Sequence, residues 1–374
     1  MATSLLSGVA FGAALTASGV YHPSVILEQL KLADWSMLET FLTATASSTL
    51  LISAFHAANL VKLAPRSYSG LGFFAHYDGN ILGGALLGAG MALSSSCPGT
   101  VLAQIGAGIW SNGLPTLVGA MLAGILWTGY LRPWLLLRTC KLGEGHEGSS
   151  KKRERSKTVH EALGISKYIA TAAFEGLLGA AVAGLTWLSI ASRAPSSSLP
   201  DGGSAPWSET IARAARPAAG GLLIGLAQLA SLLLRGSAVG VSAAYEDAGE
   251  FVWWPFYSPG SESDSESESD SSSASKDSRP ILKSSSILFA TGIVFGSRVL
   301  AVLTPGLLDT TSAIPDIPVW QAVLGGFLMV TGARVAGGCT SGHGITGMSL
   351  LSVSSFVTIG SALAVGVLTA RTFL

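Results

Sequence analysis

The hydrophobic positions of this chain gather in long stretches, and most of its charged positions lie between them. About nine of the apolar stretches approach the ~20 residues that a helix needs to cross a bilayer. Runs of this length and number exceed what the core of a soluble domain requires, so the pattern predicts an all-α polytopic membrane protein. The predicted segments are Leu5–Tyr21, Trp35–Leu63, Ile81–Ser96, Leu114–Leu137, Tyr168–Ser192, Pro217–Leu234, Ile287–Leu303, Val319–Gly338 and Phe356–Leu374.

Two of the glycine-rich segments carry a cysteine at the same place. Cys97 and Cys339 each follow one glycine by 13 residues and a second by seven, which are Gly84 and Gly90 in the first copy and Gly326 and Gly332 in the second. An internal repeat within apolar sequence is typical of transporters, in which the site lies between two related halves. The repeat therefore favours a carrier or channel over a soluble enzyme.

Both cysteines are followed by residues that interrupt a helix. Pro98-Gly99 comes directly after the first, and Ser341-Gly342 lies just past the second. A broken helix is tolerated inside a membrane only where its free backbone groups are buried in protein or line a cavity. We therefore expect two pseudo-symmetric, inverted halves with broken or re-entrant half-helices at the cysteine motifs.

Further glycine patterns bear on the duplication. Gly8–Gly12 and Gly292–Gly296 both read GxxFG, and we interpret them as corresponding parts of the two halves. A third glycine-rich segment, Gly220–Gln228, opens the second half and carries no cysteine.

The charged residues predict how the chain is divided. Residues 1–138 are expected to form the first membrane half and residues 168–374 the second. Between them, the loop 139–167 carries seven Lys and Arg residues, and the positive-inside bias places it in the cytosol. Residues 193–216 then face the opposite compartment. An acidic, serine-rich tract at about 258–285 has the composition of a disordered loop.

Composition removes several other classes of function. Only 12% of the 374 residues are charged and the net charge is zero, so there is no electrostatic case for binding nucleic acid. The chain has no Walker loop and no dinucleotide fingerprint, and no cofactor is predicted. Three cysteines do not make a disulfide framework, and the third, Cys140, lies at a basic helix end. The first apolar segment has no basic residues ahead of it, which predicts a retained helix and not a cleaved signal.

The paired cysteines suggest the chemistry of a ligand. A cysteine in a bilayer is most often a small hydrophobic residue, but two at matched helix breaks favour a functional role. A thiol is a weak donor and a soft acceptor, and the N-terminus of a half-helix favours an anion. Together they suggest a small anion that contains sulfur.

Other uses of these residues stay open. Cys339 and His343 are four residues apart and could contact one metal ion, but no second Cys or His lies near Cys97 in the sequence. The same pair could act as nucleophile and base, although no carboxylate accompanies it, so no catalytic residue is predicted. Ionisable or amide side chains also fall within or at the ends of the apolar stretches: Glu39, Lys62, Glu175, Gln228, Arg298 and Arg334.

The stretch Gly332–Gly347 reads GARVAGGCTSGHGITG, and it resembles the signature of the YeeE/YedE sulphur-transport family. Ser96–Thr100 resembles the family's other cysteine motif more loosely, and Ser18–Pro23 is similar to its opening helix. The resemblance implies an inverted helical carrier or pore for thiosulfate or a related sulfur compound, which passes between the thiols of Cys97 and Cys339 without covalent chemistry. Family members often have a further cysteine near the first helix, where this chain has none.

We therefore predict a transporter of thiosulfate or a related anion in the lipid bilayer. The plasma membrane is favoured over an organelle membrane, and a cytosolic sulfur-handling protein is a candidate partner. The alternatives are a transporter of a selenium compound or soft metal, and a non-transporting sulfur relay or sensor. The predicted substrate-binding residues are Cys97, Pro98, Gly99, Arg334, Cys339, Thr340, Ser341, Gly342 and His343, and no metal site is predicted.

Overall fold

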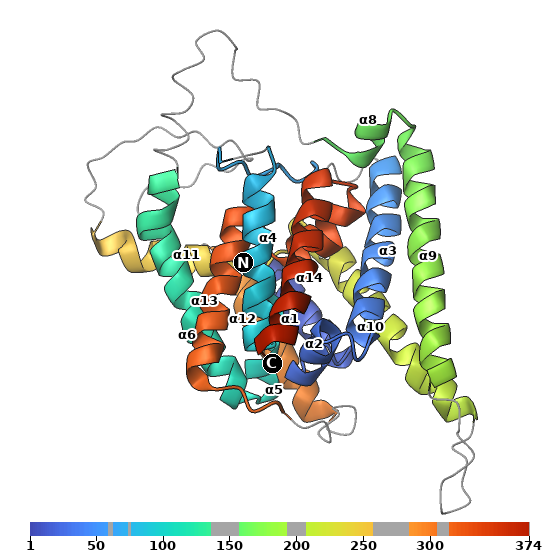
Figure 1. Cartoon of the computed structure of the whole chain (residues 1–374), viewed down its shortest axis with the longest axis horizontal. Helices are drawn as coiled ribbons and strands as arrows, with labels where there is room; N and C mark the ends of the chain where they lie inside the picture. The colour runs from blue at the N-terminus through green and yellow to red at the C-terminus, as the bar shows by residue number, and fades with distance from the viewer. Residues whose placement is uncertain are drawn as a thin grey trace, which may run out of the picture.

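The computed structural model describes residues 1–58, 63–73, 76–135, 157–192, 207–256, 284–304 and 314–373. Within these ranges all regular secondary structure is helical, apart from one isolated bridge between Thr158 and Ser352. The helices are α1 (Ala2–Ala17), α2 (Pro23–Leu30), α3 (Ser36–Ala57), α4 (Asp78–Ser94), α5 (Pro98–Ala107), α6 (Trp110–Leu126) with η1 (Trp127–Leu131), α8 (Val159–Leu163), α9 (Lys167–Ser192), α10 (Trp207–Arg235), α11 (Ser242–Trp253) with η2 (Trp254–Phe256), α12 (Ser285–Leu303), α13 (Val319–Ala336), η4 (Ser341–Gly347) and α14 (Val353–Phe373), as Figure 1 shows.

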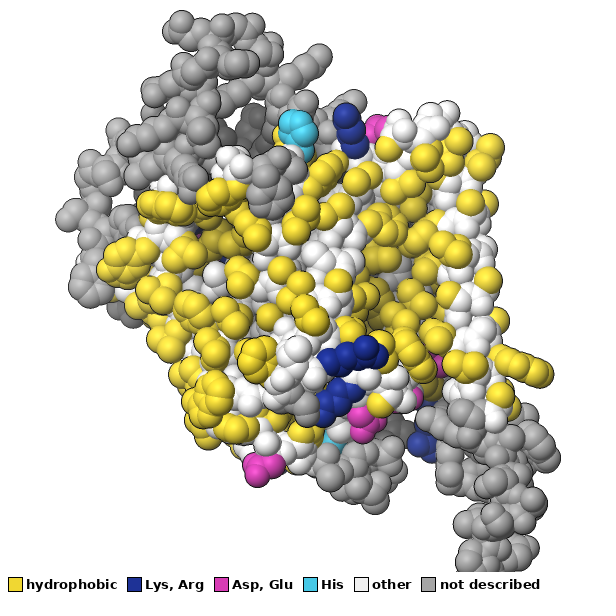
Figure 2. Space-filling model, in the orientation of Figure 1, with side chains coloured by type: hydrophobic (Ala, Val, Ile, Leu, Met, Phe, Trp, Pro, Cys, Tyr) yellow, Lys and Arg dark blue, Asp and Glu magenta, His cyan; other side chains and the backbone are white. Residues whose placement is uncertain are grey.

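The helices match the predicted membrane architecture. Among the described residues, eight helical segments are long and apolar enough to cross a membrane, and α1 is a shorter apolar helix of 16 residues. On the face drawn in Figure 2, hydrophobic side chains cover the middle and charged side chains lie toward the upper and lower ends. This distribution fits a bilayer around the middle of the molecule. The prediction of an all-α polytopic membrane protein is confirmed.

Two sets of six elements follow one another in the same order. The first runs from α1 to α6, and the second runs through α10, α11, α12, α13, η4 and α14. Their contacts repeat as well, since α1 packs on α12 as α10 packs on α3, and α4 packs on α14 as α13 packs on α6. The chain therefore folds as two related halves that are intertwined.

The equivalent helices α4 and α13 run antiparallel at the centre. Gly83 near the start of α4 faces Ala336 at the end of α13, whereas Gly90 near the end of α4 faces Met329. The absence of side chains lets the two backbones approach closely, as is common between membrane helices. Antiparallel packing of equivalent helices means that the second half is inverted relative to the first, as the cysteine repeat predicts.

The two GxxFG segments are packing partners in the structure. Gly8 and Gly12 of α1 lie against Phe289 and Ile293 of α12, and Gly296 of α12 lies against Val9. By order and contacts, however, the counterpart of α1 is α10, which carries Gly220–Gln228. The contacts therefore do not support the interpretation of the two GxxFG segments as corresponding parts of the two halves. Their shared pattern reflects the mutual fit of two helices.

Helix α9 lies outside the pattern shared by the two halves. It contacts α3, α10 and α8, and Figure 1 shows it at the edge of the molecule beside α3. Several predicted features lie outside the described residues: most of the basic loop, Lys62, Cys140, residues 193–206 and the acidic tract through residue 283.

Candidate functional site

The first helix break places Cys97 at the N-terminus of a half-helix. Ser95 ends α4 in the left-handed conformation, with φ 46°, so the chain turns away from the helix axis. Cys97 is the N-cap of α5, and Pro98 takes the first helical position, where a missing N–H costs nothing. The cap is reciprocal: Cys97 N–H donates to Thr100 Oγ1 at 2.6 Å, and Thr100 N–H donates to the Cys97 sulfur at 3.4 Å.

A buried polar network supports this break. Asn112 of α6 donates from Nδ2 to the Ser94 carbonyl at 2.9 Å, and Ser96 Oγ donates to Gln104 Oε1 at 3.0 Å. All four residues are fully or almost fully buried. The network satisfies backbone groups that the interrupted helix leaves free, which is the condition for irregular backbone in a membrane.

The second helix break buries Cys339. Gly337 ends α13 with φ 84°, and the Cys339 side chain is only 1% exposed. Its sulfur lies 3.2 Å from Ser341 Oγ. Backbone N–H groups of Gly342, Val241 and Ser242 also lie near this sulfur. The Cys339 sulfur is therefore at the meeting point of two helix N-termini, those of η4 and α11.

The N-terminus of α11 joins the two cysteine motifs. Tyr245 of α11 donates its hydroxyl to the Pro98 carbonyl at 2.7 Å, and burial raises the pKa of this hydroxyl, so it stays protonated. A Cβ placed on Gly99 would lie 3.5 Å from Val241. Sequence reasoning missed α11 because its 12 residues are too short for a membrane span. The available signal was the pair Gly236 and Gly240 just ahead of it.

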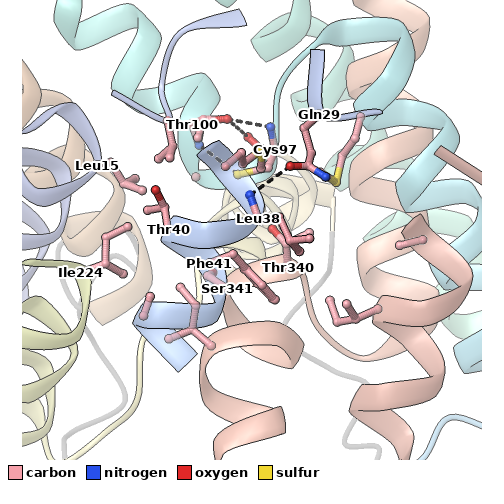
Figure 3. Close-up of a pocket in the computed structure, with 18 of the residues that line it drawn as sticks. Leu15, Gln29, Leu38, Thr40, Phe41, Cys97, Thr100, Ile224, Thr340 and Ser341 are labelled. Carbon is pink, nitrogen blue, oxygen red and sulfur yellow. Dashed lines mark hydrogen bonds between the residues drawn. The ribbon is translucent and has the colours of Figure 1, made fainter. Parts of the chain in front are cut away.

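A cavity of about 100 Å³ opens beside these breaks (Figure 3). Cys97 and Thr100 contribute to its wall from the first motif, and Thr340 and Ser341 contribute from the second. The rest of the lining is largely apolar and comes from helices of both halves, and Cys339 does not reach the cavity. Cys97 is thus the thiol in the cavity wall, and Cys339 is the buried one.

Helix α2 is a further half-helix at the cavity. His22 caps it by accepting from Ser24 N–H, and Pro23 takes its first position. Gln29 and Leu30 near its end line the cavity. The sequence analysis matched Ser18–Pro23 only to an opening helix and predicted no helix directly after Tyr21, although the His-Pro pair is a helix-start signal.

His343 and Arg334 are turned to other partners. His343 is fully buried, with Nδ1 2.9 Å from Ser355 Oγ and Nε2 3.1 Å from the Ala336 carbonyl. Arg334 forms an ion pair with Glu246 of α11. Neither side chain lines the cavity, and each holds neighbouring helices at the second break. Pro98 accepts a hydrogen bond from Tyr245 through its backbone carbonyl, and Gly342 has no side chain, so both act at the helix breaks through their backbones.

Arg132 extends the ion pair of Arg334 into a network. It lies 3.3 Å from Glu246 and 2.9 Å from Glu250, so the segment directly after η1 is joined to α11 and, through Glu246, to Arg334 of α13. Within the described residues, no group of three or more His, Cys, Asp and Glu side chains is arranged to hold a metal ion.

Comparison with known proteins gives this arrangement a context. A family model described as "Sulphur transport" matches residues 17–369. The chain belongs to the sulphur-transport family. Among relatives, a probable transporter from Xylella fastidiosa is 28% identical over 155 residues, which are 41% of this chain and 90% of that protein. Membership of the sulphur-transport family confirms the sequence resemblance and the assignment to membrane transport of sulfur compounds.

Proposed function

We propose that this protein carries a small sulfur-containing anion, thiosulfate first, along a path that passes Cys97 and then Cys339. The observation that supports this proposal best is the placement of the two thiols. Cys97 lies in the wall of a cavity between the halves, and Cys339 lies at the next helix break, behind Ser341. Backbone N–H groups at helix N-termini lie near both sulfurs.

The chemistry of the path suits an anion with a soft end. Helix N-termini carry partial positive charge and can attract an anion without a full countercharge. The thiols offer weak, polarisable contacts to sulfur, so the anion is held loosely enough to leave. The cavity wall is largely apolar and offers few other hydrogen bonds, so the cysteines are the main polar contacts for the anion along the path.

Passage from one thiol to the other requires movement. Cys339 is 1% exposed and does not line the cavity, whereas its neighbours Thr340 and Ser341 do. We propose that the half-helices shift to expose Cys339 when the anion leaves Cys97. The anion stays intact, no covalent bond forms, and the protein acts as a transporter and not an enzyme.

The test is uptake of labelled thiosulfate by a host that lacks its own transporter. We expect Cys339→Ala to abolish uptake, and Cys97→Ala to lower it about tenfold or more, because each removes one contact to a charged ligand. Cys140→Ala is the matched control and should leave uptake unchanged. Normal uptake by the Cys339 variant at equal expression would rule out the thiol role.

The same assay separates the alternatives. Uptake into proteoliposomes by the purified protein would exclude a relay or sensor that depends on a cytosolic sulfur-handling partner. Competition by selenite or Cu(I) that exceeds competition by unlabelled thiosulfate would assign the path to a selenium compound or a soft metal. We expect thiosulfate to compete best, because it combines negative charge with exposed sulfur.

A further inference from the structure

A loop beside α4 forms a strap that carries Arg66 toward the second cysteine motif. In residues 63–73, Ser69 donates from Oγ to the Val335 carbonyl at 2.6 Å and from its N–H to Asn80 Oδ1 at 2.8 Å. The Asp78 carboxylate accepts from the backbone of Leu71 and Phe73. These hydrogen bonds fix the strap to α4 and α13.

Arg66 itself is held by its backbone. The Arg66 carbonyl accepts from Ser352 Oγ at 3.0 Å and from Ser354 Oγ at 3.1 Å. Ser352 directly precedes α14, and Ser354 lies in its first turn. The position of Arg66 is therefore tied to the segment that carries the second cysteine motif.

The guanidinium of Arg66 occupies a recess made by three glycines. A Cβ on Gly342 would lie 3.1 Å from Nη2, and Cβ atoms on Gly338 and Gly240 would lie 3.6 Å and 3.7 Å from the guanidinium. Gly338 precedes Cys339, the N–H of Gly342 lies near its sulfur, and Gly240 precedes Val241, whose N–H lies near it as well. A side chain at Gly342 would crowd the guanidinium, whereas a Cβ at Gly338 or Gly240 would make ordinary contact with it.

Arg66 also adds positive charge to the surroundings of Cys339. Burial lowers the pKa of the Arg66 guanidinium, and the nearby Cys339 sulfur acts in the opposite direction. An arginine stays charged in a protein, so the side chain remains cationic. Arg66 does not line the cavity near Cys97, so its charge acts at the second motif.

We propose that Arg66 and Cys339 form a two-point site in which the guanidinium binds the oxygen end of the anion and the thiol contacts its sulfur end. The inference rests on the proposed transport function and assigns a specificity-determining residue to it. A guanidinium pairs with oxyanions through two parallel hydrogen bonds, whereas a thiol suits a soft atom. Thiosulfate has both ends, sulfate has only the first, and thiocyanate has only a soft sulfur end.

The test compares Arg66→Gln and Arg66→Lys in the thiosulfate uptake assay. We expect Arg66→Gln to raise KM about tenfold or more, and Arg66→Lys to restore part of this loss, because the charge returns without the planar fork. Competition by sulfate should weaken in Arg66→Gln, and competition by thiocyanate should persist. Arg371→Gln, at the exposed end of α14, is the matched control and should keep the wild-type KM.

A second variant tests the recess without removing the charge. Gly342→Ala should push the guanidinium aside and raise KM for thiosulfate while expression stays normal. Wild-type KM and unchanged competition in Arg66→Gln, with uptake still lost in Cys339→Ala, would overturn the Arg66 assignment and leave the proposed function intact. If the wild type takes up no thiosulfate, the proposed function fails. The Arg66 assignment then falls too unless thiosulfate raises the melting temperature of the purified wild type and not of Arg66→Gln.

Discussion

Neighbouring side chains within the second cysteine motif serve different purposes. The Cys339 sulfur lies near N–H groups at two helix N-termini. The His343 ring instead forms hydrogen bonds with the Ala336 carbonyl and the Ser355 hydroxyl. The sequence could not separate these two roles, because both residues are polar and lie in one glycine-rich run. What separates them is the direction of each side chain after the break, which depends on contacts with α13 and α14.

His343 is expected to act on stability. His343→Ala would leave the buried Ala336 carbonyl and Ser355 hydroxyl without their ring partner, which costs about 1–3 kcal/mol. Thermal unfolding in detergent should show a lower melting temperature, and Ser355→Ala should show a smaller decrease. The remaining folded protein should keep the wild-type KM. A raised KM at unchanged stability would instead make His343 a substrate ligand, as the sequence predicted.

At the scale of the helices, length decided what the sequence could predict. The long apolar helices and the two cysteine breaks were found, because their hydropathy and their Gly and Pro residues act locally. The half-helix α2, with eight residues, and α11, with 12, were missed, since neither has the length of a span. Arg66 was also missed, because its loop has no periodic pattern. Its role depends on packing against residues far away in the sequence.

The glycines between α4 and α13 permit a test of close packing. A Cβ on Gly90 would collide with the backbone of Met329 and Gly325, so Gly90→Ala should force the central helices apart and lower the melting temperature. Gly360→Ala is the control, because nothing lies within 4 Å of its Cβ position in α14. That change should be neutral or stabilise by about 0.5–1 kcal/mol, as alanine does in a helix. Equal effects of the two changes would refute close packing at Gly90.

The whole molecule is an inverted pair, so its orientation decides which compartment each end of the path meets. Arg66 precedes α4 and lies near Gly338 and Gly342 of the second motif, whereas Cys97 follows the other end of α4. The basic loop 139–167 predicts the cytosolic side, because short loops rich in Lys and Arg stay in the cytosol. Helix α9 follows this loop and is long and apolar enough to cross a membrane, so the sequence predicts that the chain after it lies on the other side.

Cys140 makes this orientation measurable. In the Cys97→Ala, Cys339→Ala double variant it is the single remaining thiol of the three in the sequence. A membrane-impermeant maleimide should label it only after the host cells are permeabilised, because the basic loop is predicted to be cytosolic. A matched variant that also carries Cys140→Ala and Ser196→Cys moves the thiol beyond α9 and should be labelled in intact cells. The reverse pattern would invert the protein in the membrane, so that the Arg66 end of the path would meet the anion first during uptake.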